Sequence, residues 1–169
     1  ETSFSRDLKV FDSTIGARFP NPAIEKQFGD DTMPKTGDNV AVEYGVTRED
    51  ADRFAAASQA KYEAAKQAGF FAGEIVGVEV AQGRKLPPKL VETDEHPRPS
   101  SDFTALQKLK PLFEDGVVTA GNASGVNDGA AALIIGSAAA EQKLGIKPMA
   151  KILSSGAAGI EPRIMGAGP

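Results

Sequence analysis

The residues with the clearest chemical potential form a stretch of small side chains at positions 117–136. Glycine and alanine let a backbone approach a ligand closely, and a serine hydroxyl beside exposed loop amides can hold the amide groups of an extended ligand. The alternative is a tight connection between two buried strands, in which the small residues serve packing alone. Taken by themselves, the residues favour the packing interpretation.

His96 is the single histidine and the obvious candidate for a general base. It lies in the acidic, proline-containing loop at 94–99, and no serine or cysteine nucleophile can be paired with it by spacing. We therefore favour a solvated loop histidine.

Basic residues outnumber acidic ones by six to four between positions 84 and 110, which reverses the sign of the whole chain. Arg98, Lys108 and Lys110 in this stretch can bind the phosphate groups of an anionic cofactor. An ordinary mixed surface fits the same pattern equally well.

Several other residues have a structural interpretation. The acidic residues near the middle of the first half follow no calcium-loop spacing, so we interpret them as a solvated acidic face. They are Asp30, Asp31, Glu43, Glu49, Asp50 and Asp52. Met33 and Phe113 stand alone beside turns and by themselves indicate core or edge packing rather than the walls of a ligand site.

The composition excludes several classes of protein. The chain has 169 residues, 41% of them apolar and 25% charged, which is ordinary for about one soluble globular domain. The net charge of −4 argues against a non-specific nucleic-acid binder, and no apolar run approaches the ~20 residues of a membrane span. No cysteine and one histidine leave no disulfide and disfavour a zinc site. Because the chain shows no signal peptide either, we expect a cytoplasmic protein with no nucleic-acid, membrane or metal partner.

The elements that must position these residues divide into a helix-rich part and a later part with alternating strands. In the first part we expect a strand or hairpin at 8–19 and a helix that is capped by Thr36 and ended by Gly45. A long helix should follow, from a capping box at 47–50 to Gly69. We then expect strands at 74–80 and 89–91 and a short helix that is capped by Asp102 and stopped by Pro111. In the second part we expect strands at 117–119, 130–135 and 150–154 and a helix at 138–144 ended by Gly145.

The segment 118–132, VTAGNASGVNDGAAA, resembles a signature of the thiolase family, and the match is long and specific. Other stretches resemble the same family in the same order along the chain: 32–41, 48–59, 94–99, 106–111 and 162–169. Within the family, DSTIGARFPNP at 12–22 is most similar to degradative thiolases of the 3-oxoadipyl-CoA type.

The resemblance implies an α/β fold of two βαβαβαββ halves in five layers, αβαβα, with a helix-rich loop domain. It predicts a loop domain at 1–113, the end of the N-terminal catalytic half at 114–146 and the start of the C-terminal half at 147–169. We therefore expect the sequence to be an internal piece of a longer chain. We also expect poor stability or association of the piece alone, because its strands lack partners.

Thiolases transfer an acyl group between a cysteine and coenzyme A, either cleaving a 3-oxoacyl-CoA or condensing two acyl-CoAs. The catalytic cysteines, the Gly-His-Pro histidine and the Asn-Glu-Ala-Phe motif of the family are not in this sequence. The His96-Pro97 pair departs from the family pattern because Glu95 replaces the glycine. The 169 residues alone are therefore expected to be inactive, with the catalytic groups upstream of Glu1 and downstream of Pro169.

The resemblance places coenzyme A binding in this chain, with CoA as a substrate rather than a resident cofactor. Arg98 matches a position that faces the CoA nucleotide, and Ser124 matches a serine that contacts the pantetheine amides. The adenine and pantetheine path is matched by Leu109, Phe113 and Ala120.

At the acyl end, Met33 matches a methionine of the family, while Thr32 and Pro34 depart from the commoner residues there. The stretch 8–19 matches a tetramerisation region, so we expect a homo-oligomer, a dimer or tetramer. The alternative function is a non-catalytic CoA-binding module or a thiolase-like scaffold.

Overall fold

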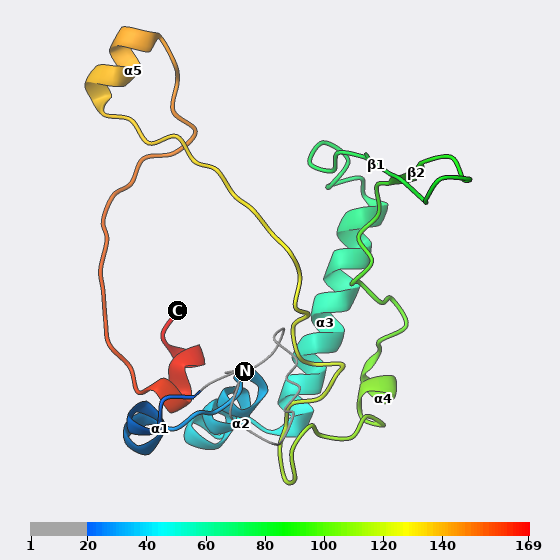
Figure 1. Ribbon diagram of the computed structural model, residues 1–169, viewed down its shortest axis with the longest axis vertical. Helices are drawn as coiled ribbons and strands as arrows, with labels where there is room; N and C mark the ends of the chain where they lie inside the picture. Colours follow the sequence, from blue (N-terminus) through cyan, green and yellow to red (C-terminus); the bar gives the residue numbers. More distant parts are fainter. Residues whose placement is uncertain (1–19) are drawn as a thin grey trace, which may run out of the picture.

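A computed structural model describes residues 20–169 as a few helices and one small sheet connected by long loops (Figure 1). The strand or hairpin expected at 8–19 lies outside the described residues. The elements, in chain order, are α1 (Pro22–Phe28), α2 (Met33–Tyr44), α3 (Arg48–Gln67), β1 (Val78–Val80), β2 (Lys89–Val91), α4 (Phe103–Leu106), α5 (Ala138–Leu144) and the 3-10 helix η1 (Pro162–Ala167). Sequence patterns did not indicate α1 or η1. None of the helices in residues 20–169 has the length and apolar character needed to cross a membrane.

The long helix α3 begins at the expected capping box. The Thr47 hydroxyl accepts a hydrogen bond from the Asp50 backbone N–H at 3.1 Å, and the Thr47 backbone N–H donates to the Asp50 carboxylate at 3.1 Å. The Thr47 hydroxyl and N–H both donate to this carboxylate, so they lower the pKa of Asp50 below its ordinary value. The start of α3 predicted from the sequence is therefore confirmed.

Helix α2 begins earlier than predicted. Thr32 occupies the N-cap position, and Thr36 lies buried inside the helix, where its hydroxyl donates to the Met33 carbonyl at 2.8 Å. The expectation that Thr36 caps the helix is thus wrong, because Met33 and Pro34 already fit the first turn, where proline has no N–H to satisfy. The helix ends as predicted at Gly45, whose φ of +66° is a conformation that glycine adopts without strain.

The segment η1 packs against α2, although the two are far apart in the sequence (Figure 1). The Asn39 side-chain amide on α2 donates to the Arg163 carbonyl at 2.9 Å and to the Asp31 carboxylate at 2.7 Å. The guanidinium of Arg163 also lies 3.8 Å from the Glu43 carboxylate. These contacts bring the last described residues back to the α1–α2 end of the molecule.

The two short strands form a hairpin beyond the C-terminal end of α3 (Figure 1). They are antiparallel, with Val78 opposite Val91. The second strand matches the prediction, whereas the first begins at Val78 rather than at Glu74 because only three residues find a partner in β2. A stack of Tyr62 on Phe71, with ring centroids 5.2 Å apart, packs the end of α3 against the connection to this hairpin.

Residues 126–161 leave the rest of the molecule in a wide excursion that contains only α5 (Figure 1). The helix α5 was predicted, and Ser137 caps it by accepting from the Ala140 N–H at 3.2 Å. The strands expected at 130–135 and 150–154 are not formed in the described chain. The apolar side chains are present there, but a strand also needs a neighbouring strand to satisfy its backbone groups, and none lies beside these residues.

Candidate functional site

The small-residue stretch begins as a tight hairpin beside α2. Pro111 and Thr119 form an isolated antiparallel bridge, and the Leu112 N–H donates to the Val118 carbonyl at 2.9 Å. The strand expected at 117–119 is therefore reduced to this bridge. Gly37 lies inside α2, and a Cβ there would meet Val118 at 3.0 Å. The absence of a side chain at Gly37 thus lets the hairpin approach the helix closely.

Asn122 organises the loop that follows the bridge. Its side-chain oxygen accepts from the Thr119 N–H at 2.7 Å, and its amide donates to the Val117 carbonyl at 2.9 Å. The Thr119 hydroxyl in turn accepts from the Gly121 and Asn122 N–H groups at 3.2 and 3.3 Å. A compact, internally hydrogen-bonded turn results, and Ser124 follows it directly.

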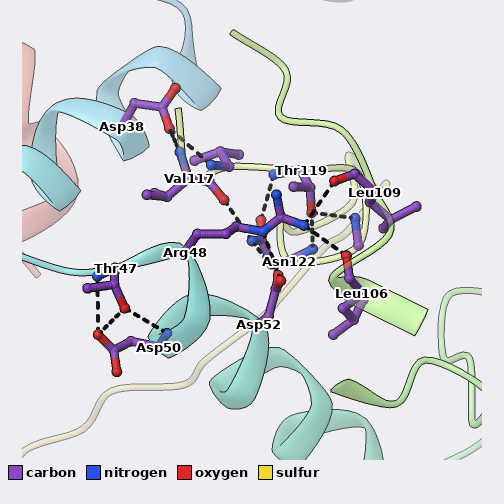
Figure 2. Close-up of polar contacts among 12 residues, drawn as sticks. Asp38, Thr47, Arg48, Asp50, Asp52, Leu106, Leu109, Val117, Thr119 and Asn122 are labelled. Carbon is purple, nitrogen blue, oxygen red and sulfur yellow. Dashed lines mark hydrogen bonds and ion pairs between the residues drawn. The ribbon is translucent and has the colours of Figure 1, made fainter. Parts of the chain in front are cut away.

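Two residues of α3 connect this loop to the helix (Figure 2). The Asp52 carboxylate accepts from the Asn122 amide at 3.0 Å and from Arg48 Nε at 2.8 Å. The Arg48 guanidinium also donates to the carbonyls of Leu106 and Leu109 at 2.8 and 3.0 Å. Asp52 has 0% of its surface exposed, so its assignment to a solvated acidic face is wrong. A carboxylate is tolerated there because both of its oxygens are paired.

Asp38 holds the same hairpin from the side of α2 (Figure 2). Its Oδ1 accepts from the Val117 and Val118 N–H groups at 2.8 and 3.0 Å. The side chain is buried, and within the described residues its Oδ2 has no hydrogen-bond partner. A Cβ on Gly116 would collide with this carboxylate, so glycine is required for the close approach.

The loop at 92–101 lies along α3 and reaches the small-residue loop. The Tyr62 hydroxyl donates to the Asp94 carboxylate at 3.0 Å, and the Gln59 side chain accepts from the Arg98 N–H at 2.9 Å. Partial burial raises the pKa of Tyr62, and the carboxylate of Asp94 adds to this shift. A Cβ on Gly125 would lie 2.7 Å from the His96 ring, so the glycine lets the two loops approach closely.

The structure brings several of the candidate binding residues onto these two adjacent loops. All five predicted CoA-binding residues are exposed, so a ligand can reach them: Arg98, Leu109, Phe113, Ala120 and Ser124. His96 is exposed as expected, and its contact with Gly125 joins the loop of Arg98 to the loop of Ser124.

Met33 and Phe113 lie near the start of α2 rather than in a core. Met33 is 65% exposed, which contradicts its interpretation as a packing residue. The Lys35 ammonium lies 5.6 Å from the centre of the Phe113 ring, a cation–π contact at the edge of the hairpin. Met33 is exposed because it is the first residue of α2, whose packed face begins with Thr36 one turn later.

Sequence reasoning missed the residues that hold the site together. Asn122 stood within the recognised segment, but Asp52 is 70 positions away, and no local pattern shows that the two meet. The nearest signal in the sequence was the spacing of Arg48 and Asp52, four residues apart on one helix. That spacing more often indicates an ion pair on the surface. Among residues 20–169 no cluster of three or more potential ligands could hold a metal ion.

A family model described as the thiolase N-terminal domain matches residues 9–139. The chain is 54% identical over 170 residues to the beta-ketoadipyl-CoA thiolase of Pseudomonas putida. This alignment covers all of this chain and 42% of the relative. It is 48% identical to the 3-oxoadipyl-CoA/3-oxo-5,6-dehydrosuberyl-CoA thiolase of Escherichia coli, over 99% of this chain and 42% of the relative.

Solved structures agree with these sequence matches. The human mitochondrial 3-ketoacyl-CoA thiolase superposes with a TM-score of 0.73 at 43% identity, over 83% of this chain and 35% of that protein. A structure of the same human protein in complex with CoA superposes with a TM-score of 0.69 at 42% identity, over 83% of this chain and 34% of that one. The chain thus spans about two fifths of the length of the curated relatives that it matches.

Proposed function

The chain belongs to the thiolase family and carries part of the α/β thiolase fold, and on this premise we propose that it contributes the CoA-binding loops of an acyl-CoA acyltransferase. In the proposed reaction, a 3-oxoacyl-CoA is cleaved by free CoA, or two acyl-CoAs are condensed. The substrate that the relatives favour is 3-oxoadipyl-CoA, because proteins named for that activity are 48–54% identical to this chain. The chain contains no cysteine, so the acyl-accepting thiol would come from residues outside these 169.

One observation carries the proposal: Arg98 and Ser124, the two polar residues expected to bind CoA, lie exposed on two loops that meet at His96 and Gly125. CoA has an anionic nucleotide at one end and a neutral amide-containing arm at the other. Arg98 offers a guanidinium for a phosphate group, and Ser124 offers a hydroxyl for the pantetheine amides. Two chemically different subsites on adjacent loops suit such an extended ligand.

Apolar contacts would complete the proposed site. Leu109 and Phe113 are each little more than one third exposed and can cover the adenine ring, while Ala120 leaves space for the pantetheine arm. Met33, at the start of α2, would face the acyl group. The existence of a CoA complex of a similar protein supports this use of the loops.

The test is the kinetics of Arg98→Ala and Ser124→Val in the full-length enzyme that contains this chain. Each variant should raise the KM for CoA by about tenfold, because each removes a polar or charged contact, and should lower kcat much less. Contacts remote from the reacting bond contribute equally to the ground state and the transition state. Arg84→Ala is the matched control, since Arg84 is also exposed but lies in the connection between β1 and β2.

Unchanged KM values in both variants would count against this site. CoA binding without any acyl transfer in the full-length protein would favour the alternative, a non-catalytic CoA-binding module. The cytoplasmic location, the dimer or tetramer and the division at 113 and 146 stay predictions.

A further inference from the structure

Arg48, Asp52 and Asn122 form a polar trio, centred on the buried Asp52, between α3 and two segments that carry proposed CoA contacts (Figure 2). Asp52 is inaccessible to solvent, and each of its oxygens has one donor. A buried carboxylate is costly unless it is paired in this way. None of the three residues belongs to the CoA contacts proposed above, so their role has to be sought in what they hold.

The trio forms hydrogen bonds to the segments on both sides of the site. On one side Nη2 of Arg48 donates to both the Leu106 and the Leu109 carbonyl, while Nε of the same rigid, planar guanidinium donates to Asp52. On the other side Asn122 ties together the backbone of Val117 and Thr119. Asp52 connects the two sides through one carboxylate.

Few buried apolar side chains help to hold these segments together. Within the described residues the buried apolar side chains are Ala41 and Leu106. Leu106 lies against Gly121, where a Cβ would collide with it. The loop is therefore held mainly by directed hydrogen bonds, which fix an orientation more strictly than apolar contacts do.

We propose that Arg48, Asp52 and Asn122 are positioning residues of the CoA site, which set Leu109 on one side against Ala120 and Ser124 on the other. This inference rests on the proposed function. The physical gain is preorganisation: a loop already held in its binding conformation loses less freedom when CoA binds. Removal of the trio should therefore weaken CoA binding without any loss of a CoA contact.

The first experiment compares Asn122→Ala with the wild type in the full-length enzyme. The KM for CoA should rise by about tenfold with kcat changed less than about twofold, because a lost hydrogen bond to a charged group corresponds to roughly that factor. Glu49→Gln is the control, since it removes an ion pair on the same helix that is exposed on both sides. That control should leave both constants unchanged.

The second experiment is a charge exchange. Asn122→Asp alone places two carboxylates against each other and should raise the KM for CoA more than Asn122→Ala does. Adding Asp52→Asn restores a donor between positions 52 and 122 and an acceptor for Arg48. The double variant should recover part of the lost affinity, which a general loss of folding would not allow.

A third measurement separates this inference from the proposed function. Hydrogen exchange in the CoA-free protein should accelerate in Asn122→Ala at the N–H groups of Thr119 and Gly121, which the network protects. If the wild type has no acyl transfer or CoA dependence, the proposed function fails and exchange still reports whether the trio orders the loop. Faster exchange with an unchanged KM for CoA would overturn the positioning role, as would unchanged exchange or a double variant no better than Asn122→Asp.

Discussion

The hairpin and loop at 111–123 and the excursion at 126–161 follow each other in the chain but differ in what surrounds them (Figure 1). The first is held by Asp38 and Asp52 through hydrogen bonds of 2.8–3.0 Å. The second also contains an apolar run at 130–135, yet Leu133 and Ile134 in it are almost fully exposed. Polar partners within this chain therefore hold the first segment in place, whereas an apolar run without a neighbouring surface does not form the expected strand.

The largest expected effect comes from removing a buried charge in the first segment. Asp52→Ala should lower the free energy of unfolding by about 3 kcal/mol, because Arg48 and Asn122 lose their shared partner. Urea denaturation of the purified 169-residue chain would measure the change. In the same chain, Ile134→Ala should change that free energy by less than about 0.5 kcal/mol, since the side chain touches nothing to lose.

The Ile134→Ala variant also tests the comparison in the full-length protein. If the residues outside this chain provide strands that cover 130–135, Ile134→Ala should there cost about 2–5 kcal/mol, as truncation in a core does. A small cost in both proteins would mean that this apolar run stays uncovered.

Two glycines offer a smaller contrast between the segments. Gly121→Ala should destabilise the protein by about 1–3 kcal/mol, because the new Cβ collides with Leu106 and Leu109. Gly129→Ala should cost almost nothing in the 169-residue chain, because no atom lies within 4 Å of the added carbon. Thermal denaturation of the two variants side by side would check this. Equal losses of stability would show that the two loops are packed alike.

The smallest expected effect concerns helix caps and pH. Thr47→Ala should cost about 1 kcal/mol at neutral pH through the lost cap of α3. The pKa of Asp50 is lowered in the folded chain, so its contribution is present above the ordinary aspartate pKa and is lost as the pH falls through the lowered one. The acid limb of the stability profile should therefore be shallower in Thr47→Ala. Circular dichroism from neutral to acidic pH measures this.

The control for the cap is Ser137→Ala, which removes the corresponding cap of α5. Because α5 is seven residues long and lies alone in the excursion, its loss should melt that helix and leave the stability of the rest unchanged. A common cost for both caps would show that the excursion folds together with the rest.

Local rules predicted the elements that local contacts stabilise. The capping box at Thr47 and Asp50 and the αL glycines at 45 and 145 all involve residues within one or two turns, so their spacing is visible in the sequence. The predicted strands at 130–135 and 150–154 are not formed. The apolar pattern indicates which side chains should be buried, but it does not supply the neighbouring strand that would bury them. For the site, the resemblance supplied the candidate contacts, and the structure added that the loops of Arg98 and Ser124 meet at His96 and Gly125.

What the sequence determined by itself was the family, the start of α3, the glycine ends of α2 and α5, and the absence of a cysteine nucleophile in these 169 residues. What only the tertiary structure decided was the role of Asp38, Asp52 and Asn122. Asp52 and Asn122 lie 70 positions apart, and Asp38 lies 79 from Val117. The sequence alone does not show whether water or a distant amide donates hydrogen bonds to a carboxylate. Burial excludes the water and makes the distant partner obligatory, and burial exists only once the chain has folded.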